Sequence, residues 1–208
     1  MPGSTPLSSR YVQAYDGGDC FFLNPIDVTE RRADIEGFGA DVAPFEAFDA
    51  AFKRTLGFEA NIAVRLLAPA QCPLPAFLRQ VDRGDSSLRL SLASVNVRSG
   101  QTVSGSVEGF GPGAVDVIVL DHEGRVESVA PSLSRIGSRA EFVLQVADAD
   151  RQTRRPKVVI AISSPQRLET LALQAPVAGA DFFPRLLAEA RSRNVPITVA
   201  VKYLRIDT

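Results

Sequence analysis

The stretch VDVIVLDHEGRVESV, residues 115–129, decides the fold of the second half of the chain. Every second residue of 115–119 is valine, which is the period of a β-strand with one buried face. The turn sequence Asp-His-Glu-Gly follows at 121–124, and Gly124 can adopt the positive φ of a tight turn. A second short strand then covers 126–129, so the stretch predicts a β-hairpin.

Other apolar residues alternate in the same way on both sides of this hairpin. The alternating sets are Leu88, Leu90 and Leu92; Val103 and Val107; Phe142, Leu144 and Val146; and the run from Val158 to Ile162. Together with 115–119 they make five short strands, and this spacing indicates a β-sandwich-like pair of sheets. Asp181 can cap a helix that continues through Arg193, and a β-branched run at 197–206 predicts a last strand.

The first part of the chain has a different order of elements. After an irregular lead to about residue 13, strand patterns alternate with helical ones, and phenylalanines recur at three- and four-residue spacing in the first helix. The expected elements are a strand opening at Cys20, a strand over 32–39, a helix from Pro44 ended by Gly57, a strand over 58–67 and a helix over 73–81. The order β-β-α-β-α is that of a small α+β layer.

A polar segment, DRGDSS at 82–87, separates these two patterns. The sequence therefore predicts an α+β fold of two domains. The first is a small β-β-α-β-α domain over 14–82. The second is a β-sandwich-like domain over 88–208 with one packed helix.

Composition excludes several classes of protein. The 208 residues are 45% hydrophobic and 23% charged, which is typical of a soluble globular protein and not of a disordered chain. A formal net charge of -1 provides no basic field, so we expect neither nucleic acid nor an anionic membrane as a partner. Residues 1–10 lack the basic and apolar regions of a signal peptide, so an exported protein would contain this chain as an excised fragment.

Cys20 and Cys72 are the only cysteines, and both fall in the predicted first domain. They are too few for a zinc site of four thiolates and too far apart for a CxxC redox motif. A structural disulfide in an oxidising compartment, two buried free thiols, and a reactive or metal-binding cysteine remain as alternatives. A bridge would stabilise the small domain by about 4 kcal/mol.

No set of residues in the sequence forms a recognisable catalytic, cofactor or metal site. His122 is the sole histidine and is expected to be an exposed turn residue. GFGPG at 109–113 lacks the spacing of a phosphate-binding loop, and we expect a turn between strands. Asp148 and Asp150 lack the other ligands of a calcium loop. We therefore predict no cofactor and no enzyme activity for this chain, although a hydrolase with unpaired acidic residues is a remaining alternative.

Two features are candidates for contact with a protein partner or a small ligand. Phe110 lies between two glycines, so its ring is either an exposed anchor at a loop tip or folded back over the end of the sandwich. The one cationic cluster consists of Arg151, Arg154, Arg155 and Lys157, and it is either a solvated loop or a binding site for an acidic partner.

The second domain also resembles a known family. The runs VSGSVEGFGPGAVDVIVLDHEGRVESVAPSL at 103–133, AEFVLQV at 140–146 and PKVVIAISSPQRLETL at 156–171 resemble the DUF4384 domain and related C-terminal regions of bacterial membrane-anchored serine/threonine protein kinases. DGGDCFFL, IEGFG and AQCP in the first domain are similar to the region that precedes such domains in alphaproteobacterial kinases, and to small BON-like modules.

The resemblance implies a non-catalytic, periplasmic sensor or interaction region of a serine/threonine protein kinase. The chain itself contains no kinase Gly-rich loop with its strand lysine, no HRD and no DFG. Binding of a ligand or protein partner would then change the association of kinase domains across a membrane. The alternative is a structural component of a cell-envelope or secretion assembly.

Overall fold

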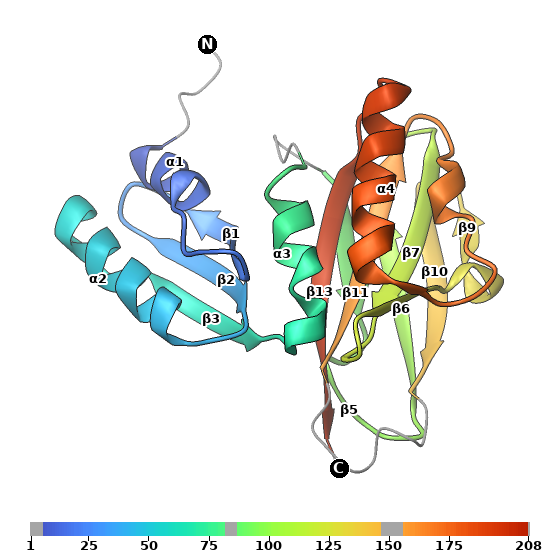
Figure 1. The fold of residues 1–208 in the computed structure, drawn as a ribbon, viewed down its shortest axis with the longest axis horizontal. Coiled ribbons are helices and arrows are strands. Elements are labelled where there is room, and N and C mark those ends of the chain that lie inside the picture. Colours follow the sequence, from blue (N-terminus) through green and yellow to red (C-terminus); the bar gives the residue numbers. More distant parts are fainter. Residues whose placement is uncertain (1–5, 82–86, 147–155, 208) are drawn as a thin grey trace. The chain divides into compact units, whose positions relative to one another are not determined.

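The computed structural model describes residues 6–81, 87–146 and 156–207, which form two compact units, Met1–Ala76 and Phe77–Thr208. The described residues contain helices and three β-sheets, so the predicted α+β class is confirmed (Figure 1). Each unit is described separately below.

The first unit is a three-stranded sheet with helices. Its elements are α1 (Leu7–Ala14), β1 (Phe21–Val28), β2 (Ala33–Gly39), α2 (Ala43–Leu56), β3 (Asn61–Leu66) and a 3-10 turn (Pro69–Gln71); α3 (Pro73–Leu78) begins in it and ends in the second unit. The sheet has the order β1-β2-β3. Strand β1 is antiparallel to β2, and α2 is the crossover to the parallel strand β3. The β-β-α-β order matches the sequence prediction, whereas α1 was expected to be irregular.

Aromatic side chains dominate the core of this unit. Helix α2 buries Phe45, Phe48 and Phe52, the three- and four-residue pattern seen in the sequence. Strand β2 accommodates Phe45 because Gly37 and Gly39 carry no side chain: a Cβ there would lie 2.4 and 2.9 Å from its ring. The IEGFG pattern thus provides a flat patch on which one ring packs.

The second unit is a sandwich of two sheets with one long helix. Its strands are β4 (Arg89–Leu92), β5 (Asn96–Arg98), β6 (Thr102–Glu108), β7 (Ala114–Leu120), β8 (Arg125–Ser128), β9 (Ser134–Ile136), β10 (Arg139–Gln145), β11 (Lys157–Ser164), β12 (Val177–Ala178) and β13 (Thr198–Asp207). One sheet has the order β4-β6-β10-β9, and the other has the order β12-β8-β7-β11-β13-β5. Two 3-10 turns, Ala130–Ser132 and Glu169–Leu171, and helix α4 (Gly179–Ser192) complete the unit.

The core of the second unit lies between its two sheets. Alternating residues such as Val107 and Phe142 from the four-stranded sheet meet Val117, Val119 and Val159 from the six-stranded sheet in one apolar cluster. The predicted hairpin is present, with the Gly124 amide donating to the Asp121 carbonyl at 3.0 Å.

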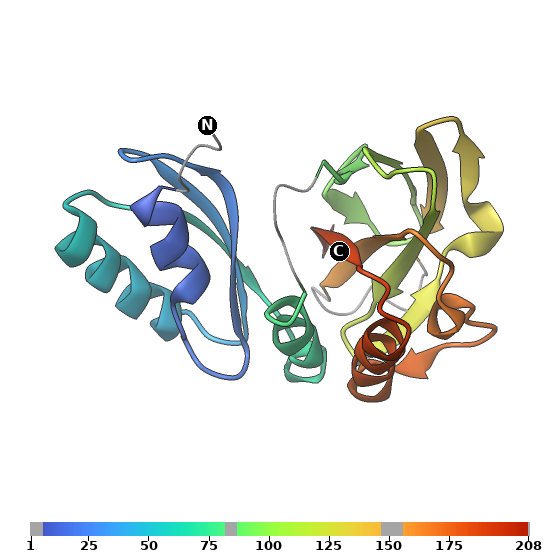
Figure 2. The ribbon, with the colours of Figure 1, turned by 90° about the horizontal axis from the view of Figure 1, so that it is seen from above.

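Helix α4 lies outside the sandwich (Figure 2). Its apolar face is buried. Phe77 stacks on Phe183 of this helix with 4.9 Å between ring centroids. Residues from Phe77 onward therefore belong with the second unit, and the division falls earlier than the polar segment at 82–87 that the sequence suggested. Helix α4 also begins at Gly179, before the expected cap at Asp181, so Pro184 lies beyond its first turn.

Candidate functional site

The two cysteines form a disulfide. Cys20 and Cys72 are joined with 4.9 Å between their Cα atoms, and there is no free cysteine. The bond connects the residue before β1 to the residue before α3, 52 positions apart. The pairing considered from the sequence is present, and in this structure neither sulfur is available as a nucleophile or a metal ligand.

Phe110 is buried and is not an exposed anchor. Its ring is 5% exposed and belongs to the apolar cluster between the two sheets. Arg135 covers it, with the guanidinium carbon 4.8 Å from the ring centroid, and donates a hydrogen bond to the Gly113 carbonyl at 2.6 Å. Of the two alternatives for Phe110, the structure therefore has the ring folded back into the sandwich, and it is not an exposed contact for a partner.

The other sequence candidates do not form a site among the described residues. Arg151, Arg154 and Arg155, with Asp148 and Asp150, lie outside that part of the chain. His122 is on the β7–β8 turn with its side chain 20% exposed, so it is partly buried where an exposed residue was expected. Within the described ranges, no three His, Cys, Asp or Glu side chains are placed to hold a metal ion.

The structure offers a different candidate, a hollow of about 560 Å³ on the outer face of the four-stranded sheet. We call it the serine trough, because five of its lining residues are serines. They are Ser91 on β4, Ser104 and Ser106 on β6, Ser132 in the turn before β9, and Ser134 on β9. A second hollow of about 510 Å³ shares Ala93 and Ser104 with it and continues over Asn96 and Thr102.

Strand register places these side chains in rows across the sheet. Ser91 pairs with Ser106, Ser106 with Glu141, and Glu141 with Ser134, so one row crosses all four strands. Their neighbours in sequence point into the sandwich because successive side chains on a strand face opposite ways. The outward serines are thus positioned by the same alternation that builds the core.

The charged groups of the trough are paired with one another. Arg139 contacts Glu108 and donates to Glu141 at 2.9 Å. The hydrogen bond that Arg139 donates to Glu141, with the nearby charge of Glu108, raises the pKa of Arg139. Arg139 and Glu141 line the trough and Glu108 lies beside Arg139, so these three exposed side chains form one ion-pair network on β6 and β10.

The serines of the trough divide into one structural residue and four free ones. The Ser132 hydroxyl donates to the Val143 carbonyl at 2.8 Å and accepts from its amide at 3.3 Å, which completes the hydrogen bonding of β10 beyond the end of β9. Within the described ranges, no hydrogen-bond partner is present for the hydroxyls of Ser91, Ser104, Ser106 and Ser134. Ser106 is only 8% exposed.

Sequence reasoning missed the trough because it followed only the apolar residues of each strand. The signal was present as serines at alternate positions of 104–106 and 132–134. Serine is common in loops, so this pattern acquires meaning only when register aligns the strands.

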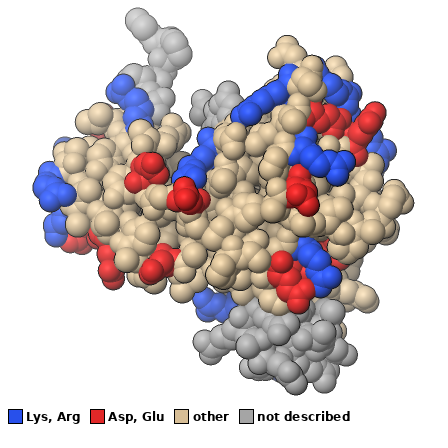
Figure 3. All heavy atoms as spheres, viewed as in Figure 1, with Lys and Arg blue, Asp and Glu red and all other residues tan. Residues whose placement is uncertain are grey.

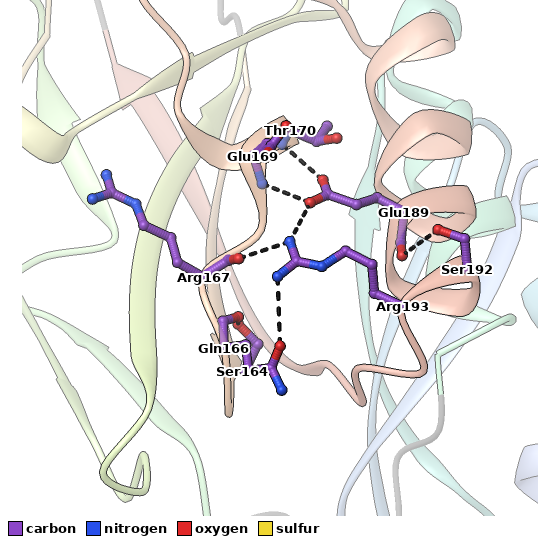
Figure 4. A network of polar contacts seen from close by, with 8 residues as sticks. All are labelled: Ser164, Gln166, Arg167, Glu169, Thr170, Glu189, Ser192 and Arg193. Atoms are coloured by element: carbon purple, nitrogen blue, oxygen red, sulfur yellow. Dashed lines mark hydrogen bonds and ion pairs between the residues drawn. The ribbon is translucent and has the colours of Figure 1, made fainter.

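A second polar network lies on α4 and has a structural role (Figure 4). The Glu189 carboxylate accepts hydrogen bonds from the backbone amides of Glu169 and Thr170 at 2.7 and 2.8 Å, and from Arg193 at 2.8 Å. Burial raises the pKa of Glu189, but these donors outweigh it and lower the pKa to about 2. Arg193 also donates to the Arg167 carbonyl at 3.0 Å, so the network fastens the segment before α4 to the helix.

Two surface properties complete the description. On the face drawn in Figure 3, acidic and basic side chains are interspersed. None of the helices in the described part of the chain is long and apolar enough to cross a bilayer.

In comparisons with protein-family models, curated proteins and solved structures, no match to this chain was found.

Proposed function

We propose that the chain is a non-catalytic extracytoplasmic binding module, the sensor or interaction region of a bacterial serine/threonine protein kinase. The serine trough is its binding surface. Occupancy of the trough by a ligand or protein partner would change the association of kinase domains across the membrane. The resemblance of 103–171 to kinase-associated domains supplies the kinase part of this proposal.

The single observation that carries the binding role is the serine trough. It is a broad hollow on the outer face of a sheet, lined by free hydroxyls and by Arg139 and Glu141, which belong to one ion-pair network with Glu108. Such a surface can recognise a ligand through many weak polar contacts, without a positioned nucleophile or base.

The Cys20–Cys72 disulfide supports the extracytoplasmic part of the proposal. Disulfides persist in oxidising compartments such as the periplasm and are reduced in most bacterial cytoplasms. The bond closes a small unit of the kind that gains most from such a constraint.

The test uses the full reading frame in its own cells. We expect it to encode a kinase domain and one membrane span upstream of this chain, and the chain to be protected from protease until the outer membrane is opened. Ser104→Arg should place a long cationic side chain in the trough and change the autophosphorylation of the kinase, while Ser138→Arg, on the exposed β9–β10 turn, should leave it unchanged.

Two outcomes would contradict the proposal. One is a reading frame without a kinase domain whose product is found in a large envelope complex, which is the scaffold alternative. The other is a chain that fractionates with the cytoplasm with Cys20 and Cys72 reduced.

A further inference from the structure

We infer that the serine trough binds a neutral, polyhydroxylated chain, which is the chemistry of an uncharged glycan. This inference rests on the proposed function of the trough as the binding surface and names its class of ligand. Three properties of the trough carry it: an unpaired hydroxyl at its floor, the neutrality of its free polar groups, and its extent.

The first property is the position of Ser106. Its residue is 92% buried, it lines the trough from the middle of β6, and its hydroxyl has no hydrogen-bond partner among the described residues. Solvent reaches this hydroxyl, so a hydroxyl of a ligand that enters the trough can replace water as its hydrogen-bond partner. Ser91 and Glu141 flank Ser106 on the neighbouring strands, so an entering group would meet three polar side chains in one row.

The second property is that the free polar groups are uncharged. Arg139 is engaged by Glu108 and Glu141, so an anionic ligand that approached it would meet two carboxylates. The remaining groups are the hydroxyls of Ser91, Ser104, Ser106 and Ser134. Each hydroxyl is both a donor and an acceptor, as is each hydroxyl of a sugar, so the two surfaces can pair in either direction.

A peptide strand is a poorer match to this surface. Strand addition uses the unpaired backbone groups at the edge of a sheet, whereas the serines project from its face.

The third property is extent. The trough and the adjoining hollow share Ala93 and Ser104, so the hydroxyl-lined surface continues from β9 across to the residues that follow β4. The added part also carries neutral side chains, Asn96 and Thr102. A surface of this length suits several sugar residues in a chain better than one monosaccharide.

The experiment is a titration of the isotopically labelled chain, followed by amide chemical shifts. The probes are three neutral linear hexasaccharides, chitohexaose, cellohexaose and maltohexaose. A sulfated hexasaccharide and a neutral hydrophilic decapeptide are the charged and peptide comparisons. We expect saturable shifts on β4, β6 and β10 with at least one neutral sugar.

Matched variants connect the binding to the hydroxyls. Ser104→Ala and Ser106→Ala should each weaken binding by about 2- to 10-fold, the range for one lost hydrogen bond. Ser138→Ala, on the exposed turn, should leave binding unchanged. Unaltered melting temperatures for all three variants would show that the fold is intact.

Shifts on the trough only with the decapeptide or the sulfated sugar, or no shifts on it with any probe, would overturn the glycan inference. Neither result bears on the proposed function, since the reading frame, the location of the chain and the Ser104→Arg phenotype decide that separately.

Discussion

The guanidinium of Arg135 covers the ring of Phe110, 4.8 Å from its centroid, and so closes one end of the sandwich. The same side chain reaches the carbonyls of Gly111, Gly113 and Gly137. One arginine on β9 therefore holds the loop at 109–113 by hydrogen bonds, and Phe110 is the side chain of this loop that is buried in the core.

Phe110→Ala should destabilise the second unit by about 3–5 kcal/mol, because it opens a cavity in the core and removes the partner of Arg135. Urea denaturation followed by circular dichroism measures the loss. Phe110→Leu, which keeps most of the buried volume, should cost clearly less. A loss below about 1 kcal/mol for the alanine variant would mean that the ring is not core, since surface substitutions have effects of that size.

Replacing both cysteines, Cys20→Ser with Cys72→Ser, should destabilise the first unit by about 4 kcal/mol, the chain-entropy value for a bond spanning 52 positions. The unfolding transition of the second unit should be unchanged. Before that comparison, alkylation and intact-mass measurement under non-reducing denaturing conditions should show no labelled thiol. Two labelled thiols in oxidised preparations would contradict the disulfide.

The low pKa of Glu189 predicts a specific dependence of stability on pH. A carboxyl whose pKa is lowered on folding contributes stability above its usual pKa of 4.5, and this contribution is lost as the pH falls towards about 2. Glu189→Gln should therefore cost on the order of 2 kcal/mol at pH 7, and the difference from the wild type should shrink between pH 4.5 and 2.

Glu127→Gln is the matched control for Glu189, since Glu127 is exposed on β8. Its substitution should not change stability at any pH. If Glu189→Gln lowers the free energy of unfolding by the same amount from pH 7 to pH 2, the stabilisation comes from the shape of the side chain and not from its charge.

Asp116 gives the opposite dependence on pH. Burial raises its pKa, and Arg167 offsets only part of this effect. A carboxyl whose pKa is raised on folding favours the folded state below its usual pKa of 3.8, and this advantage is lost as the pH rises through the folded value. Asp116→Asn should therefore raise the melting temperature at pH 7 and have a smaller effect at pH 3; a lower melting temperature at pH 7 would contradict this account.

The sequence predicted most of the regular structure where apolar periodicity was strong. Gly57 ends α2 in the left-handed conformation, and the alternation at 115–119 forms β7 as expected. Helix α1 was missed because its stability comes from tertiary contacts: Val12 is buried in the aromatic core, and the Ser8 hydroxyl donates to the Thr29 carbonyl. Such contacts leave little trace in local sequence.

The candidate site was much less predictable. Phe110 has the same neighbours in sequence whether it is exposed or buried, and the deciding residue, Arg135, is distant along the chain. The trough depends on the register of four strands, which apolar alternation alone does not determine. For the two cysteines, counting left one possible pair for a disulfide, but free thiols and a reactive cysteine stayed open as alternatives until the structure showed the bond.

The pairing of β5 with β13 makes the six-stranded sheet depend on residues that are far apart in the sequence. Asn96 pairs with Arg205 in parallel, so an edge of the six-stranded sheet is completed by residues at the end of the chain (Figure 1). Contacts this distant in sequence form late because a long loop must first be closed. The three-stranded sheet is built only from residues 21–66, so it can form while the rest of the chain is still being translated. Loss of residues 198–207 would instead remove β13, the strand that lies between β11 and β5 in the six-stranded sheet.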